Sequence, residues 1–547
     1  MKRTVPLAVR FSRPKHEIHG RREERGGSMR IASVVFVLLC AVALPLPGFS
    51  QQEKLGKVAF PTSCDSKVQG QFERGVAMLH SYWFTEARKV FDAVIQQDPS
   101  CAIAYWGLAV NYLGNSLAAA PSSKDIAAAS EGLDKARAIG AKTQRERDWI
   151  EGIGVYYRDP DKVPLNARLV AYTQAMEQMT QRYPDDFEAW TYYALTLQAS
   201  APKNDKTYGN QLKSAEILER LFKQNPEHPG VAHYLVHAYD YPPLADKGIR
   251  IAGQYARIAP AAPHARHMPS HIYSMVGMWE ESIASNRSAL EVQPDYHHAT
   301  DFMVYAHLQL AQDAKAKALV DLIVALPQRE YPILANFTAV AAIPARYALE
   351  RADWAGAGAL PISSTGRVMA DSLTRFARGL GMARSGDLVG AKREVQALQE
   401  LRSALEQSSQ SYWADRTQEQ ILAVAAWVAY AEGARDQATK LMRAAADGED
   451  GSVKHVAMEN RLYPMRELLG ELLLQIGKPA AALGEFEASL KENPNRYRSL
   501  SGAARAAEAA GDRQKAVGYF EKLVALSSKA DTTRPELAHA KAFLGPR

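Results

Sequence analysis

Apolar and polar positions along the chain recur with the period of an α-helix, in units of 34 residues. Pro226, Pro260 and Pro294 are 34 residues apart, and so are Gly477 and Gly511. Between such marks the pattern predicts two amphipathic helices joined by a short turn. No run of alternating apolar residues predicts a β-sheet. We therefore expect an all-α chain built from repeated helix pairs.

Each unit places a small residue one helical turn before an aromatic residue. A small side chain lets two helices approach closely, and the aromatic ring then fills the remaining gap. The pairs that show this spacing are Ala87 and Phe91, Ala482 and Phe486, and Ala516 and Phe520.

This spacing resembles the tetratricopeptide repeat (TPR) family, whose repeat is also 34 residues long. Clear repeats start near residues 68, 102, 187, 229, 263, 297, 463 and 497, and weaker ones lie around Gly379, Gly386 and Ala391 and around Ala426, Gly433 and Ala438. The likeness covers about residues 63–530, with gaps at 136–186 and 330–370. It implies a right-handed TPR helical solenoid, in one or two lobes, with a concave groove.

The N-terminus has the order of an export signal. Met29 and Arg30 precede an apolar run from Ile31 to Leu44, and small residues follow at Gly48 and Ser50. The run is too short to cross a bilayer of roughly 30 Å. We expect a periplasmic or secreted bacterial protein without a stable membrane span after cleavage. The expected organisation is a mis-called start (1–28), a signal peptide (29–50), a linker (51–62), an N-terminal TPR solenoid with a His-rich groove (63–329), degenerate helical repeats (330–460) and a C-terminal TPR pair (461–545).

The net charge of +6 does not point to nucleic acid. Residues 1–30 hold nine Lys and Arg against three Asp and Glu, and the rest of the chain has 57 of each. The positive charge therefore lies on the segment that export would remove, and we expect no nucleic-acid partner.

Cys64 and Cys101 each precede the first helix of consecutive repeats. These helices would run parallel with their axes about 8–10 Å apart, and their ends could approach the roughly 5–6 Å that a disulfide needs. The sequence predicts this disulfide, and two buried free thiols are the alternative.

Histidines are concentrated in one part of the chain: nine of the 14 lie between residues 228 and 307. In the TPR register, several fall at the first-helix positions that line the concave groove. These groove positions hold His233, His237, Asp240, His264, His267, His271, His298, Asp301 and Tyr305, and His80 holds one in the first repeat.

Such a stripe fits a metal site. His233 and His237 share a helix face, and His267 and His271 on the next repeat would complete a set of nitrogen ligands for zinc or copper. The other groove residues would orient these ligands. Two alternatives stay open, a polar groove for an organic or peptide ligand and a purely structural network, and metal-free imidazoles would form a pH-sensitive surface. Pro269 would start its helix late and place His264 and His267 on a loop.

The sequence predicts a scaffold or adaptor that binds a peptide, protein or small ligand, with its partner in the cell envelope. The rival hypothesis is a metal-binding protein or metal-dependent hydrolase. No nucleotide-binding, hydrolase, thiol–disulfide, zinc-protease or calcium-loop motif occurs, so no catalytic residue is assigned. Segments at 79–84, 98–107, 228–240 and 264–273 are similar to a group of exported bacterial TPR proteins, a likeness that implies fold and export only.

Overall fold

Helices are the only regular secondary structure in the part of the chain that the structure describes. The computed structural model describes residues 53–326, 334–362, 366–408, 410–456 and 461–545. The predicted all-α helical solenoid is confirmed. The expected start and signal peptide lie outside the described residues. Among the described helices, none combines the length and hydropathy that crossing a bilayer requires.

The helices follow one another with short connections. Those of the first half are α1 (Ser66–His80), α2 (Phe84–Gln97), α3 (Ile103–Leu113), α4 (Ser123–Ile139), α5 (Gln144–Tyr157), α6 (Leu165–Arg182), α7 (Phe187–Ala199), α8 (Gly209–Gln224), α9 (Pro229–Tyr239), α10 (Ala245–Ile258), α11 (Pro263–His267), α12 (Pro269–Met275) and α13 (Trp279–Val292). Those of the second half are α14 (His297–Gln309), α15 (Asp313–Val324), α16 (Leu334–Glu350), α17 (Trp354–Gly358), α18 (Val368–Ser385), α19 (Leu388–Gln407), α20 (Ser411–Ala431), α21 (Arg435–Asp450), α22 (Met465–Gln475), α23 (Pro479–Glu492), α24 (Tyr497–Ala509), α25 (Arg513–Leu526) and α26 (Pro535–Leu544).

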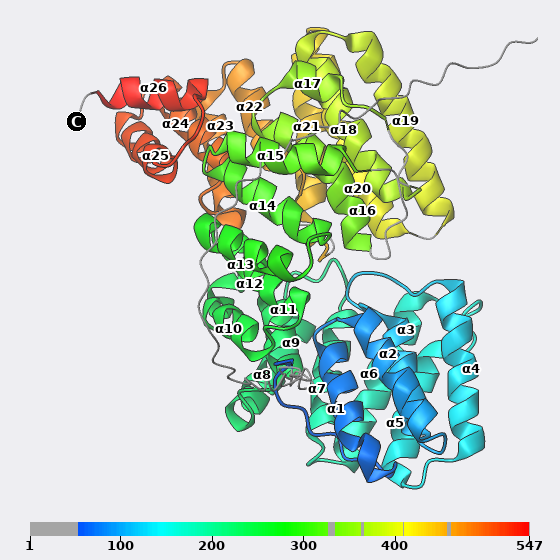
Figure 1. Cartoon of the computed structure of the whole chain (residues 1–547). Coiled ribbons are helices and arrows are strands. Elements are labelled where there is room, and N and C mark those ends of the chain that lie inside the picture. The colour runs from blue at the N-terminus through cyan, green and yellow to red at the C-terminus, as the bar shows by residue number, and fades with distance from the viewer. Residues whose placement is uncertain (1–52, 327–333, 363–365, 409, 457–460, 546–547) are drawn as a thin grey trace, which may run out of the picture. The chain divides into compact units, whose positions relative to one another are not determined.

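Each helix packs against the next one along the chain (Figure 1). Alternate helices also touch, as α1 does with α3, α7 with α9 and α22 with α24. These two kinds of contact stack helix pairs one after another, which is the arrangement of TPR-like helical repeats.

Phenylalanine rings lie between glycines of neighbouring repeats at both ends of the array. A Cβ atom added at Gly107 would lie 2.4 Å from the Phe91 ring, and one added at Gly502 would lie 2.3 Å from the Phe486 ring. Both phenylalanines are fully buried. The gap-filling role predicted for these rings is confirmed, because only a residue without a side chain leaves room for them.

The segment expected to be a linker is packed into the core. Phe60 is fully buried, and Leu55 is also buried. The Phe60 ring lies 5.3 Å from the Phe72 ring, 5.0 Å from Trp106 and 5.1 Å from Trp149, measured between centroids. The linker prediction was wrong for residues 53–62 because an aromatic side chain this large is stabilised by burial among other rings.

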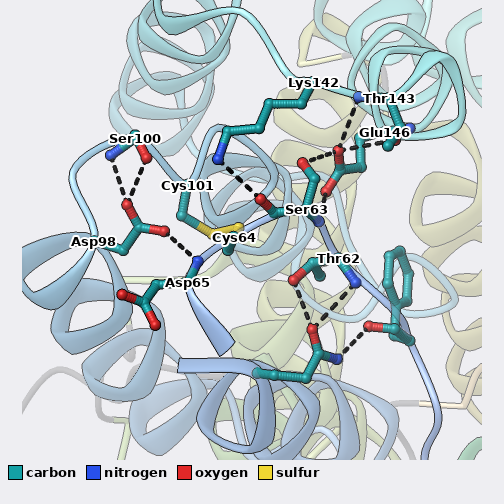
Figure 2. The surroundings of a disulfide bond; sticks show 12 residues. Thr62, Ser63, Cys64, Asp65, Asp98, Ser100, Cys101, Lys142, Thr143 and Glu146 are labelled. Atoms are coloured by element: carbon teal, nitrogen blue, oxygen red, sulfur yellow. Dashed lines mark hydrogen bonds between the residues drawn. A yellow bond between two sulfur atoms is a disulfide. The ribbon is translucent and has the colours of Figure 1, made fainter. Parts of the chain in front are cut away.

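The predicted disulfide between Cys64 and Cys101 is present, with the two Cα atoms 4.9 Å apart (Figure 2). Each cysteine lies two residues before its helix begins, Cys64 before α1 and Cys101 before α3. The Asp98 carboxylate accepts a hydrogen bond of 2.8 Å from the backbone N–H of Asp65. The disulfide therefore joins the starts of two adjacent first helices, as the repeat register required.

Two large hydrophobic cores account for most of the buried apolar residues. One extends from Leu55 to Ile272 and includes Val453, and the other extends from Ala311 to Ala540. The segment around Val453 reaches the first core, since the Val453 N–H donates to the carbonyl of Lys203 at 3.3 Å. The boundaries proposed at residues 329 and 460 stay predictions.

The C-terminal repeats return to the middle of the chain. The Trp279 indole N–H donates to the Asn495 carbonyl at 2.9 Å, and Arg534 forms a buried ion pair with Asp313. Arg496 is fully buried between two carboxylates, with its guanidinium 2.8 Å from Glu467 and 2.6 Å from Glu350. Helices α22 to α26 are thereby tied to α13 to α16.

Candidate metal centre

Six histidines from three neighbouring parts of the array come together in the structure. Helix α9 carries His233 and His237, the adjoining helices α11 and α12 carry His264, His267 and His271, and α14 carries His298. All six except the partly exposed His264 are buried, with His233 and His267 fully so. The prediction that this stripe lines an open groove was wrong, because other parts of the chain cover it.

Pro269 begins α12, as its position in the repeat suggested. The residues before it do not form a loop, since α11 extends from Pro263 to His267 and Met268 keeps helical backbone angles of φ −53° and ψ −34°. His264, His267 and His271 therefore follow one nearly continuous helical path. Their side chains can face the same neighbours on α9 and α14.

His267, His271 and His298 form one group, called the distal triad below. One ring nitrogen from each lies within 4.8 Å of the others. The Nε2 atoms of His267 and His271 are 3.0 Å apart. Two ligands of a tetrahedral ion bound at about 2.0–2.1 Å would be about 3.3–3.4 Å apart. The pair is therefore already close to the spacing that two metal ligands adopt.

The other nitrogen of each of these two rings is held by a hydrogen-bond acceptor. His267 Nδ1 lies 2.6 Å from Asn286 Oδ1, and the amide orientation is fixed because Asn286 Nδ2 donates to the Ser282 carbonyl at 2.8 Å. His271 Nδ1 lies 2.7 Å from Asp240 Oδ2. Both Nδ1 atoms therefore carry the ring proton, and both Nε2 atoms present lone pairs.

Asp240 holds the position predicted for a residue that orients a ligand. Its Oδ1 lies 3.5 Å from the ammonium group of Lys454, which comes from the segment that follows α21. Burial raises the pKa of Asp240, and the nearby Lys454 lowers it. The net effect is a pKa above the usual value, and Asp240 Oδ2 accepts the hydrogen bond from His271 Nδ1 that fixes the orientation of that ring.

His233, His237 and His264 form a second group, called the proximal triad, again with ring nitrogens within 4.8 Å of one another. His233 Nδ1 donates to the backbone carbonyl of His80 at 2.6 Å, and its Nε2 lies 2.9 Å from His264 Nε2. His264 Nδ1 lies 2.9 Å from the hydroxyl of Tyr296. Neither ring nitrogen of His237 has a hydrogen-bond partner among the described residues.

Burial keeps these imidazoles neutral. It lowers the pKa of His267 to about 4, and it lowers the pKa of His233, His237, His264, His271 and His298 well below the usual value. Neighbouring imidazoles lower most of these values further. Neutral imidazole is the form that binds metals. Five of the six side chains are buried and the pKa of all six is lowered, which does not support the pH-sensitive surface considered for these residues.

His80, predicted to occupy a groove position beside the other histidines, belongs instead to a third buried group. Its Nε2 and that of His228 each lie 2.8 Å from one oxygen of Glu188, and its Nδ1 lies 2.9 Å from the Tyr234 hydroxyl. His228 caps α9, with Nδ1 accepting from the Val231 N–H. Every ring nitrogen in this group has a partner of the right kind, so its hydrogen bonds explain it without a metal.

Asp301 and Tyr305 lie outside the centre, so their assignment to it was wrong. Asp301 forms a buried, two-pronged ion pair with Arg346 of α16, at 3.0 and 3.3 Å. The Tyr305 hydroxyl accepts from Arg496 at 3.0 Å. Both residues stand at groove positions of the repeat, but partners distant in sequence occupy their polar atoms.

Sequence reasoning missed three residues that hold the histidines in place, namely Asn286, Tyr296 and Lys454. Asn286 and Tyr296 lie on the helix and turn that follow α12, where no spacing marks them. Lys454 lies in the irregular segment between α21 and α22. The contact between Lys454 and Asp240 depends on how the chain folds back, which the repeat period does not encode.

A small cavity adjoins Lys454. It has a volume of about 50 Å³, and its lining includes Lys454, His455, Trp413, Arg461 and Glu419. Burial, followed by repulsion from Glu449, raises the pKa of Glu419 to about 8. Lys454 therefore links this cavity to the histidine centre, because it lines the cavity and also pairs with Asp240, the residue that orients His271.

No family model and no curated protein matches the chain. Among solved structures, the one titled "MamA MSR-1 C2" is 18% identical, covering 32% of this chain and 92% of that chain with a TM-score of 0.26. The one titled "Structure of Naa15/Naa10 bound to HypK-THB" is 15% identical, covering 86% of this chain and 65% of that chain with a TM-score of 0.23. Likeness at this level carries no argument about the centre.

Proposed function

We propose that the protein binds a transition-metal ion through the distal triad of His267, His271 and His298. The observation that carries this proposal is the 3.0 Å approach of two Nε2 atoms whose Nδ1 atoms both donate to fixed acceptors. Two neutral imidazoles in this state have no proton to share, so their lone pairs repel. A cation bound by both nitrogens turns this repulsion into two favourable bonds.

The surroundings support the same proposal. In metal sites, a ligand histidine commonly donates its other N–H to a carboxylate or carbonyl oxygen, which fixes the ring and raises its basicity. Asp240 serves His271 in this way, and the Asn286 amide oxygen serves His267. The phenyl ring of Phe302 packs 4.8 Å from the centroids of both imidazoles and shields them from water.

Three imidazole ligands suit zinc and copper, and they leave a coordination position open. An open position is what a catalytic ion needs to bind water or substrate. We therefore keep metal-dependent hydrolysis as the reaction to assay once the ion is known.

Export to the bacterial periplasm or beyond is part of the proposal. The signal-like N-terminal segment suggests it, and the disulfide between Cys64 and Cys101 supports it, because such bonds persist mainly in oxidising compartments. The likeness to exported TPR proteins agrees with this location.

The first test is elemental analysis of the untagged mature chain, purified from the periplasm without chelator. We expect bound transition metal whose content per chain falls in a His267→Ala/His271→Ala variant and is unchanged in a His539→Ala variant, whose imidazole is exposed on α26. An Asp240→Asn variant leaves all three ligands in place and should weaken metal affinity about 10- to 100-fold. An unmodified protein free of metal, even after incubation with zinc or copper, would refute the proposal.

Binding of a protein or peptide in the cell envelope is a second candidate function. A cavity of about 190 Å³ favours it, with a lining that includes Trp354 of α17, Arg384 of α18 and Arg505 of α24. Stacked aromatic and guanidinium groups of this kind are common where proteins bind partners. A partner crosslinked to the native protein, and lost when the exposed Arg505 is changed to Glu, would support this function. Equal crosslinking of both proteins would contradict it.

A further inference from the structure

We infer that the histidine centre holds two copper ions in the Cu⁺ state, one in the distal triad and a second in the proximal triad of His233, His237 and His264. This inference deepens the proposed function and rests on it. Its own evidence lies in the proximal triad, which shares no ligand with the distal one.

His237 supplies the main observation. Its side chain is 3% exposed, and neither ring nitrogen has a hydrogen-bond partner among the described residues. A buried polar group without a partner costs about 1–3 kcal/mol. No carboxylate, carbonyl or hydroxyl of the described residues lies within hydrogen-bond distance of the ring. A metal ion bound to a ring nitrogen would offset this cost.

The neighbours of His237 complete a ligand set. The backbone carbonyl of His80 holds the proton of His233 on Nδ1, so the Nε2 lone pair of His233 points into the group. His264 can donate from Nδ1 to the Tyr296 hydroxyl, which frees its own Nε2. The proximal triad then presents three lone pairs.

Tyr82 covers this group on the side of the first repeat. Its ring centroid lies 4.4 Å from that of His233, 5.2 Å from His264 and 6.1 Å from His237. The tyrosine has a positive φ of 52°, an uncommon backbone conformation for a residue with a side chain. The turn between α1 and α2 thus places an aromatic ring over the imidazoles.

The two triads adjoin each other. The rings of His237 and His271 are 5.9 Å apart between centroids, as are those of His264 and His267. Six nitrogens exceed the four ligands of one tetrahedral ion. Each triad contains ring nitrogens without a hydrogen-bond partner, namely those of His237 in the proximal triad and Nδ1 of His298 in the distal triad. A single ion bound in one triad would leave the nitrogens of the other triad without a partner.

Charge distinguishes between the candidate metals. All six ligands are neutral, and Lys454 offsets the charge of Asp240, the carboxylate that contacts His271. Two adjacent doubly charged ions repel each other about four times as strongly as two singly charged ones, and burial enlarges the difference. Imidazole nitrogens bind copper, whose Cu⁺ ion carries a single charge. The buried neutral site therefore favours Cu⁺ over Zn²⁺.

The test is an anaerobic titration of the metal-free mature chain with Cu⁺ against a coloured copper chelator. Two ions per chain are expected, falling to one in His237→Ala and to one in His267→Ala/His271→Ala. His539→Ala should keep both. A parallel Zn²⁺ titration should give weaker binding of the second ion. Circular dichroism of each variant confirms that it is folded.

The outcomes separate the two proposals. One copper ion that His237→Ala retains and the double variant loses would overturn the second site while leaving the proposed function intact. No binding of either metal would overturn both. Two zinc ions bound more tightly than copper would overturn the assignment of the metal.

Discussion

The close contact between Gly502 and the Phe486 ring makes the Gly502→Ala substitution a sharp test of how the repeats pack. The new methyl group would lie 2.3 Å from the ring, and a Cβ added at Gly470 would lie 2.9 Å from the same ring, so Phe486 packs closely against two glycines. The ring cannot move away from both glycines at once. We therefore expect the substitution to force apart α22, α23 and α24.

Two opposing terms set the size of the effect. Replacing Gly by Ala inside a helix stabilises by about 0.8–1 kcal/mol. Inserting a methyl group into a filled core costs about 1–3 kcal/mol. Gly484 lies in α23, where an added Cβ would meet no described atom within 4 Å. Gly484→Ala should therefore show the favourable term alone, and the two variants should differ by about 1–3 kcal/mol.

Urea unfolding followed by circular dichroism measures this difference, and hydrogen exchange of residues 465–526 locates it. Shortening the ring in a Phe486→Leu background should reduce the penalty of Gly502→Ala. Gly502→Ala and Gly484→Ala proteins of equal stability would refute the reasoning, because the glycine would then not be required by the ring.

Three other predictions follow from buried groups. Arg496→Met should destabilise the C-terminal repeats by about 3–5 kcal/mol in urea unfolding, because it removes the buried cation that Glu350 and Glu467 share, whereas Arg505→Met on the exposed face of α24 should change stability by less than about 0.5 kcal/mol. The pKa of Glu419 is raised to about 8 in the folded protein, so its contribution to the free energy of unfolding is full below about pH 4.5 and is lost as the pH rises toward 8. The Glu419→Gln variant should therefore show a flatter dependence of unfolding free energy on pH, and at pH 8 it should unfold at higher urea than the unmodified protein. Cys64→Ala should cost about 4 kcal/mol in the chain-entropy model for a separation of 37 residues, and an unchanged unfolding midpoint would contradict that model.

The repeat period predicted the local fold well, because it depends on contacts between neighbouring helices. The pairing of Phe91 with a small neighbour and the position of the cysteines before α1 and α3 are local consequences of the 34-residue spacing. The packing of Phe60 was missed because the sequence of a short irregular segment does not show which aromatic side chains of the fold it will contact.

The histidine centre was predicted in part, for a related reason. The groove register placed His233, His237, His267 and His271 on one side of the array, since it specifies which face of each first helix a side chain occupies, but the structure divides the predicted single ligand set between two triads. It gave His264 and His298 only a supporting role, although both are candidate ligands. It could not show that Tyr82 covers this face, because that contact joins repeats far apart in the chain.

The long-range contacts of the C-terminal repeats limit how this array can evolve. In an open array, a repeat can be duplicated or deleted with only its two neighbours adjusting. Here the ion pair between Asp313 and Arg534 and the hydrogen bond from Trp279 to Asn495 join segments more than 200 residues apart. Adding or removing one repeat between them would separate both pairs together. The number of repeats between these contacts is therefore fixed, and this part of the chain should unfold as a single cooperative unit.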